Sequence, residues 1–469
     1  MLEKAVLGAN CTPPAIDEFP QDIFTRTQLQ NGAVIVHILV TVYLFAAIAI
    51  ICDGYFVPAV EKICHILRVP PDIGGATFMA TATASPELFV NIVGTFVTEG
   101  DIGLGTILGS TVFNILGVTA CCGLTLAFTG SKSQLEWWSL TRDSVIYGIS
   151  VCLLVWFLNN EQIEWYEALT LVLVYVLYII FLIFDQQIQK YIKGKWCSNS
   201  LSDSLKSKSV ESVATSQETI SKISNKISNI ESIENFKEST TTVENGNNTI
   251  DNDDDDDDIS LFSWPSHIST IKKIVWIINW PINCAFFFTV PNCEKLKSNK
   301  WIPVAFISCI VWIGVLSYLL SWMITVIGDT FQIPDSVMGI SFLAIGAGVP
   351  EAASSIVVVK KGKGAMGISN ALGSSTLDVL LCLGLPWLLK STLVSTQKWV
   401  NINSSGLQIT TITLVITLLA FYFALMANKF RLDKWVGLYC MVIYLLFVAL
   451  ASMIELNVFM EVNLPTCLR

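Results

Sequence analysis

The chain has 469 residues, of which 53% are hydrophobic and only 14% are charged, and its mean hydropathy is +0.60. So few charged side chains cannot cover the surface of a water-soluble protein of this length, which excludes the soluble globular class. The formal net charge is −10, but most of this excess lies in one polar stretch, so the apolar remainder is close to neutral. We expect an integral membrane protein.

Apolar runs recur along the chain, each near the ~20 residues that a helix needs to cross a bilayer. Five precede a polar loop and five follow it, which predicts an all-α multi-pass membrane protein with about ten transmembrane helices. The expected spans are residues 33–51, 74–97, 103–128, 145–158, 166–184, 302–327, 336–359, 366–389, 407–427 and 434–454. The expected parts are an N-terminal tail at 1–32, membrane halves at 33–184 and 302–454, a loop at 185–301 and a C-terminal tail at 455–469.

The polar loop carries most of the net charge. Residues 201–260 hold fourteen acidic and five basic side chains, are rich in serine, threonine and asparagine, and end in the run Asp253–Asp258. This composition predicts a disordered, solvated linker over about residues 197–260. The aspartate run lacks the turn glycine and alternating ligands of an EF-hand loop, so we do not expect a calcium site there.

Basic residues in the short loops predict the orientation through the positive-inside rule. One side holds Lys62, Arg68, Lys132, Arg142, Lys360, Lys361, Lys363, Lys429, Arg431 and Lys434, and the other holds only Lys390 and Lys398. The first side is expected to be cytoplasmic, so both tails face outward. Residues 273–290 contain Pro281 and two tryptophans and favour an interfacial helix, because another crossing would place Lys360–Lys363 outside.

The outward tails contain two candidates for covalent modification. Asn10 opens the triplet Asn-Cys-Thr, which is a candidate glycosylation acceptor. Cys11 and Cys467 share the oxidising side in this topology, so a disulfide between them is a hypothesis that stands beside two free thiols. Residues 1–30 lack an apolar core, and no cleavable signal peptide is expected.

Residues 75–119 and 339–383 align without a gap at an offset of 264, which identifies an internal repeat. Each copy has Pro-Glu in its first helix and Gly-Ser-x-x-x-(Asn/Asp) in its second, with 27 residues from the glutamate to Asn114 or Asp378. Because five spans separate the copies, they enter the membrane from opposite faces. The halves are therefore expected to be inverted five-helix units, as in many secondary transporters.

Three acidic residues of the repeat, Glu87, Glu351 and Asp378, lie within apolar spans. An acidic side chain at the bilayer centre costs about 2.5–3.5 kcal/mol on insertion scales. No Lys or Arg stands nearby in the sequence to pair with them. Protonation or water contacts in a packed core would account for one such residue, whereas three at symmetry-related spacing favour a cation site.

The proline beside each glutamate adds further oxygens to this candidate site. Pro86 and Pro350 each remove a helical N–H and release the carbonyl four residues back, at Ala82 and Gly346. A released carbonyl at membrane depth is tolerated where it lines a cavity. Carbonyl, carboxylate, hydroxyl and amide oxygens are hard ligands that suit calcium, sodium and potassium.

These residues resemble the potassium-dependent sodium/calcium exchangers of the calcium/cation antiporter superfamily. The resemblance covers most of the chain and rests on Cys11–Ala15, Glu18–Pro20, Asn31–Val34, Asp53, Phe56–Pro58, Gly75–Ala80 and the two repeats, which are similar to that family's alpha repeats. It implies that Glu87 and Glu351 are the main calcium and sodium ligands and that Asp378 is linked to potassium. The accessory ligands that it implies are Ser110, Asn114 and Ser374. Thr83 and the carbonyls of Ala82 and Gly346 are further candidate ligands beside the two Pro-Glu pairs.

The resemblance implies a secondary active antiporter that exchanges calcium, carried together with potassium, for sodium by alternating access. The sequence departs from the family pattern at Thr81–Ser85 and at Gly346–Glu351, and the second segment lacks the two hydroxyls that the family has there. A potassium-independent or proton-coupled calcium exchanger and a non-transporting membrane regulator therefore stay open as alternatives.

An enzyme is not expected, because the Tyr-Asp and Gly-x-Gly-Asp signatures of intramembrane aspartyl proteases are missing from the sequence. The expected partners are small inorganic cations and the lipid bilayer, without a cofactor or a nucleic acid. The sequence is compatible with the plasma membrane and with an organelle membrane, and it does not indicate an oligomeric state.

Overall fold

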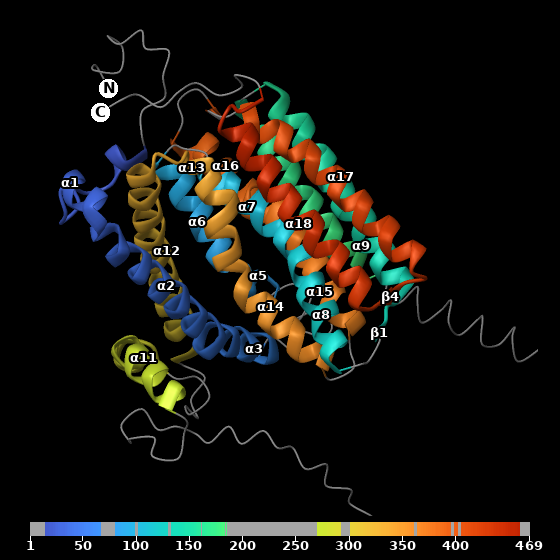
Figure 1. Cartoon of the computed structure of the whole chain (residues 1–469), viewed down its shortest axis with the longest axis horizontal. Coiled ribbons are helices and arrows are strands. Elements are labelled where there is room, and N and C mark those ends of the chain that lie inside the picture. The colour runs from blue at the N-terminus through green and yellow to red at the C-terminus, as the bar shows by residue number, and fades with distance from the viewer. Residues whose placement is uncertain are drawn as a thin grey trace, which may run out of the picture. The chain divides into compact units, whose positions relative to one another are not determined.

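A computed structural model describes residues 15–66, 80–98, 102–129, 133–160, 162–182, 184, 270–291, 301–360, 364–394, 398–401 and 405–459 (Figure 1). The described chain is almost entirely helical. Before the polar loop come α1 (Arg26–Gln28), α2 (Val34–Ile51), α3 (Val57–Ile66), α5 (Ala80–Thr83), α6 (Ser85–Phe96), α7 (Ile102–Val112), α8 (Val118–Thr129), α9 (Trp137–Phe157) and the helix Trp165–Leu182. After it come α11 (Thr270–Thr289), α12 (Ile302–Phe331), α13 (Asp335–Met338), α14 (Ala344–Lys360), α15 (Gly364–Leu377), α16 (Gly384–Leu389), α17 (Ser405–Ala427) and α18 (Lys434–Glu455).

Within the described residues, 9 helical segments are long and apolar enough to cross a membrane. They correspond to nine of the ten predicted spans. The remaining predicted span, residues 74–97, is described from Ala80 onward and consists of α5 and α6, which are separated by a break and are each too short to count alone. The chain is a multi-pass integral membrane protein, as its composition predicts.

Two spans are longer than the hydropathy pattern indicates. A π-helical turn, Cys52–Phe56, continues α2 into α3, so the first span reaches Arg26–Ile66. The run predicted at 145–158 is the longer helix Trp137–Asn160. Near the polar start of this helix, the buried Asp143 accepts hydrogen bonds from Arg142 Nε at 2.8 Å and Ser369 Oγ at 2.6 Å.

The two copies of the repeat run in opposite directions. In Figure 1 the chain rises from α5 to α6 and descends from α7 to α8, whereas it descends from α13 to α14 and rises from α15 to α16. Two short antiparallel strand pairs follow the same symmetry: β1 (Ser133–Gln134) pairs with β4 (Arg431–Leu432), and β2 (Gln162–Glu164) pairs with β3 (Trp399–Asn401). Each pair joins a loop of one half to a loop of the other.

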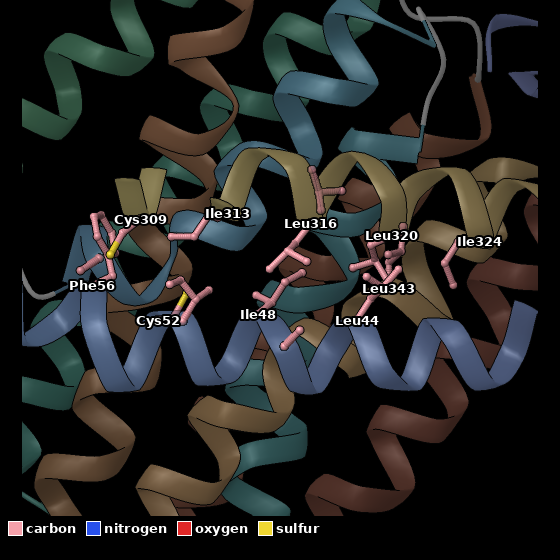
Figure 2. Close-up of a cluster of buried hydrophobic side chains, with 14 of the residues drawn as sticks. Leu44, Ile48, Cys52, Phe56, Cys309, Ile313, Leu316, Leu320, Ile324 and Leu343 are labelled. Carbon is pink, nitrogen blue, oxygen red and sulfur yellow. The ribbon is translucent and has the colours of Figure 1, made fainter. Parts of the chain in front are cut away.

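The first helix of each half packs against its counterpart along an apolar seam. On α2 and its continuation, Leu44, Ile48, Cys52 and Phe56 recur every four residues, so they lie on one face of the helix. Figure 2 shows them facing a matching row on α12, which contributes Cys309, Ile313, Leu316, Leu320 and Ile324. This seam supports the outer side of the repeat helices.

The helix α11 contains nearly all of residues 273–290, the segment that the sequence predicts to be an interfacial helix. Its Phe286 is fully buried, and the ring stacks edge-on against Tyr55 and Trp312 at centroid distances of 6.0 and 5.2 Å. The indole of Trp312 donates to Thr289 Oγ1 at 2.8 Å. These contacts anchor the C-terminal end of α11 on the seam between α2 and α12.

Candidate cation site

The Pro-Glu segment of the first copy opens a new helix. Ala84, with φ −85° and ψ 7°, interrupts the chain between α5 and α6, and Pro86 occupies the first turn of α6. Proline is tolerated there because its missing N–H has no helical partner to lose. The sequence predicts that Pro86 releases the carbonyl of Ala82, and in the structure Ser85 Oγ donates to that oxygen at 2.8 Å. A carbonyl has two lone pairs, so Ala82 retains one for a ligand.

Glu87 lies in the first turn of α6, where the positive end of the helix dipole stabilises a carboxylate. Its side chain is only 1% exposed, and its Oε2 has no hydrogen-bond partner. A carboxylate oxygen that is buried without a partner is unfavourable unless a charge of opposite sign joins it. Glu87 is therefore placed to receive a cation.

The second copy holds its glutamate on a continuous helix. α14 runs through Pro350 without interruption, and Glu351 lies in its middle. The Glu351 Oε1 accepts a hydrogen bond from Ser374 Oγ at 2.7 Å, whereas its Oε2 has no partner. This bond joins the two helices of the second copy at the level of the carboxylate.

Asn114 and Asp378 occupy matching positions in two π-helical turns. Asn114 lies in the turn Phe113–Gly117 and Asp378 opens the turn Asp378–Cys382. Such turns widen a helix locally and recur at functional sites. Both side chains are buried, and neither polar atom of Asn114 nor Asp378 Oδ2 has a hydrogen-bond partner. The two turns thus present unpaired oxygens to the interior.

The three carboxyl groups lie within electrostatic reach of one another. The carboxylate of Glu351 repels that of Glu87, and both glutamate carboxylates repel the carboxylate of Asp378. None of the three forms an ion pair with a lysine, arginine or histidine of the described chain. No three His, Cys, Asp or Glu side chains among the described residues converge on one point. The three carboxyl groups therefore do not surround a single point in the described structure.

A cavity of about 90 Å³ reaches Glu351 between α2, α6 and α14. Its volume is sufficient for several water molecules. The polar residues that line it are Cys52, Asp53, Thr83, Thr106, Glu351, Ser354 and Asn370, and the backbone of Gly346 also contributes. Water and ions in this cavity would contact Glu351 directly.

The other predicted ligands differ in their relation to the site. Thr83 and Gly346 line the cavity beside Glu351. Ser110 is fully buried, and its hydroxyl donates to the carbonyl of Ile107 in its own helix at 3.2 Å. It therefore forms no bond to Glu87 that matches the bond from Ser374 to Glu351. Asn10, Cys11 and Cys467 lie outside the described residues.

Asn91 and its hydrogen-bond partner Cys382 also lie at the site, and the sequence did not predict either of them. Asn91 lies one helical turn after Glu87, is 1% exposed, and donates from Nδ2 to the carbonyl of Cys382 at 2.6 Å. This bond links the first copy to the second. Asn91 could have been found from the sequence, because it is a polar residue four positions after Glu87 in an apolar run. Nothing in the sequence indicated its partner Cys382, which is 291 residues away.

Comparison with known proteins agrees with this geometry. The sequence profile of the sodium/calcium exchanger protein family matches residues 37–184 and 301–453. The human protein named sodium/potassium/calcium exchanger 4 is 36% identical over 98% of this chain and 87% of its own length. The mouse protein of the same name is 35% identical over 98% of this chain and 88% of its own length.

A solved structure shares the fold at low sequence identity. The crystal structure of the H⁺/Ca²⁺ exchanger CAX superposes with a TM-score of 0.53 and 10% identity, over 91% of this chain and 86% of that one. The helix order, the inverted copies and the buried carboxylates fit the sequence match over both membrane halves. The chain belongs to the sodium/calcium exchanger protein family.

Proposed function

We propose that the chain is a secondary active antiporter that exchanges calcium, carried together with potassium, for sodium by alternating access. The observation that carries the proposal is the pair Glu87 and Glu351, two buried carboxylates from inverted copies that interact with each other and have no cationic side-chain partner among the residues that the structure describes. The relatives named as sodium/potassium/calcium exchangers indicate which ions to test first.

Electrostatics supports bound cations as the missing partners. Leaving ionised carboxylates buried and unpaired is strongly unfavourable, and their mutual repulsion adds to the cost. One calcium and one potassium ion carry three positive charges, which balance Glu87, Glu351 and Asp378. Sodium ions that enter the same oxygens would displace both, so calcium leaves when sodium replaces it.

The inverted copies support alternating access. Two copies of one helix pair in opposite orientations can exchange conformations, which gives two states that open to opposite sides. Asn91 joins the copies beside the carboxylates, so a shift of one copy is felt by the other. The chain's role in this proposal is transport, with the ions as substrates and no cofactor.

Asp378 is the proposed potassium residue. Its carboxyl interacts with both glutamates but lies at the start of a separate π-helical turn. Potassium is larger than calcium and less strongly hydrated, so a single carboxylate with carbonyl oxygens suits it. A potassium-independent exchanger is the alternative that the following experiment separates.

The experiment is calcium uptake into proteoliposomes that contain the purified full-length chain. Liposomes loaded with sodium are diluted into calcium medium with or without potassium, and sodium-free liposomes serve as the gradient control. We expect uptake that requires internal sodium and is stimulated by external potassium. Uptake that ignores sodium would refute the proposal, and sodium-driven uptake that ignores potassium would favour the alternative. Glu61→Gln is a matched control because Glu61 is exposed on α3, outside the site.

A further inference from the structure

Asp53 is an acidic residue of a membrane-spanning segment that the candidate cation site does not include. It lies in the π-helical turn Cys52–Phe56 of the first span, is exposed, and lines the cavity that reaches Glu351. A carboxylate at membrane depth is costly unless it meets a cation or water, and such residues mark ion pathways. The place of Asp53 in the cavity wall therefore needs a functional account.

The first span and α14 form two walls of this cavity. The lining residues begin at Phe45 and end at Asp53 on the first span, and they begin at Gly346 and end at Ser354 on α14. In each wall they recur every three or four residues, which places them on one face of the helix. Among the described residues that line the cavity, Asp53 and Glu351 are the two that carry a charge, and both are acidic.

A contact between the two walls fixes their relative heights. The ring of Phe45 lies against Gly346, where a Cβ would collide with it. The first span and α14 run in the same direction in Figure 1. Asp53 and Ser354 each follow this contact by eight residues, whereas Glu351 follows it by five. Because a helix rises about 1.5 Å per residue, Asp53 lies about 4.5 Å beyond Glu351 along the membrane normal.

The end of the cavity at Asp53 faces the side on which α3 and α14 end, which the basic loop residues predict to be cytoplasmic. Asn370 lines the cavity from α15, a helix that starts on this side. It lies one helical turn before Ser374, which donates to Glu351. The cytoplasmic end of the cavity thus carries a carboxylate, a hydroxyl and an amide, from Asp53, Ser354 and Asn370.

We propose that Asp53 is the cation-entry residue of this cavity, whose carboxylate draws hydrated cations from the cytoplasmic side toward Glu351. Acidic groups in a narrow cleft with apolar walls focus the electrostatic potential and raise the local concentration of cations. The cavity of about 90 Å³ has room for a cation with part of its water shell. Glu351 Oε2, which has no hydrogen-bond partner, receives the ion at the inner end. This role rests on the proposed function, because Glu351 is there a ligand of the exchanged ions.

The first test measures calcium uptake into sided membrane vesicles from cells that express the full-length chain. Inside-out vesicles present calcium to the cytoplasmic face, and right-side-out vesicles present it to the outer face. Asp53→Asn removes the charge, and Asp53→Glu keeps it. Glu61→Gln is the matched control, because Glu61 is an exposed acidic residue two turns later on α3 that does not line the cavity.

At the cytoplasmic face and low ionic strength, we expect Asp53→Asn to raise the KM for calcium at least about threefold with an unchanged maximal rate. The rise should shrink to below about 1.5-fold in about 0.5 M choline chloride, because salt screens the charge. It should be absent at the outer face and in Asp53→Glu, a pattern that a purely structural role would not produce. An unchanged KM at the cytoplasmic face, or an equal rise at both faces, would overturn the proposal.

The second test does not depend on exchange. Asp53→Cys is treated with a membrane-impermeant thiol reagent in each kind of vesicle, and peptide mass spectrometry identifies the modified position. Glu61→Cys reports access from the cytoplasmic side. We expect modification at position 53 in inside-out vesicles only, and its absence there, or modification from the outer face, would overturn the proposal. If the wild type exchanges no calcium, the proposed function falls, and this labelling alone decides whether the cavity opens to the cytoplasm at Asp53.

Discussion

The first copy of the repeat holds its buried glutamate at the start of an interrupted helix, whereas the second copy holds its glutamate within a continuous one. Glu87 has no hydrogen-bonded hydroxyl at its carboxylate, but Glu351 accepts a bond from Ser374 and faces the cavity. The same Pro-Glu pair therefore serves two environments, because only the second glutamate lines the cavity. Inverted copies of one sequence pattern adopt different conformations at the same moment, which is what alternating access requires.

Equivalent glycines in the second helix of each copy also differ in how closely neighbouring atoms pack against them. A Cβ on Gly103 would collide with Asn91, and a Cβ on Gly109 would collide with the carbonyl of Ile340. At the equivalent positions, a Cβ added to Gly367 would lie 3.5 Å from the nearest atom, and a Cβ added to Gly373 would lie 3.6 Å from it, which are ordinary contact distances. We infer that the second helix of the first copy is fixed by close backbone packing, whereas that of the second copy has room to shift.

The largest expected effect comes from removing either glutamate. Glu87→Gln and Glu351→Gln should each lower sodium-driven calcium uptake to below about a tenth of the wild-type rate, because an amide cannot neutralise a divalent ion at a buried site. Initial rates in proteoliposomes measure this, with Glu61→Gln as the control. Near-normal uptake in one of the two variants would show that the copies do not share the calcium site.

Asp378→Asn is expected to remove the stimulation of uptake by potassium. The equivalent position in the first copy is Asn114, so the double variant Asn114→Asp/Asp378→Asn restores the number of carboxylates on the other side of the symmetry axis. We expect potassium stimulation to return at least in part in the double variant. A potassium titration of uptake tests both, and unchanged stimulation in Asp378→Asn would place potassium elsewhere.

The glycine comparison predicts unequal stability. Gly109→Ala should destabilise the protein by about 1–3 kcal/mol, because the added methyl group meets the backbone of Ile340. Gly373→Ala should be neutral or stabilising by up to about 1 kcal/mol, since alanine favours a helix and space is available. Thermal unfolding of both variants in detergent measures the difference. Equal shifts of Tm would remove the distinction between a fixed and a mobile copy.

The smallest expected effect separates the two serines. Ser374→Ala removes a hydrogen bond to a carboxylate, a contact of at least about 1.5 kcal/mol, so the apparent KM for calcium should rise at least about tenfold. Ser110→Ala removes only a bond to its own helix and should change KM by less than about twofold. Calcium titrations of uptake compare them. A larger rise in KM for Ser110→Ala than for Ser374→Ala would show that calcium binding depends more on the hydroxyl of the first copy, against this prediction.

The membrane class, nine of the ten expected spans and the inverted repeat were predictable from the sequence, because hydropathy and the offset of 264 are properties of the chain alone. The same offset singled out Glu87, Glu351 and Asp378. The break at Ala84 and the π-helical turns were not predictable, since a proline is compatible both with a break, as at Pro86, and with a continuous helix, as at Pro350. The bond from Asn91 to Cys382 depends on three-dimensional packing between distant segments.

The central claim is that Glu87 and Glu351, one from each inverted copy, hold the same calcium ion and yield it to sodium. Equilibrium binding of radiolabelled calcium to the purified chain tests this most directly, with sodium titrated against it. We expect saturable calcium binding that sodium displaces and that both Glu87→Gln and Glu351→Gln abolish, while Glu61→Gln leaves it intact. Calcium binding that survives either substitution, or that sodium does not displace, would contradict the claim.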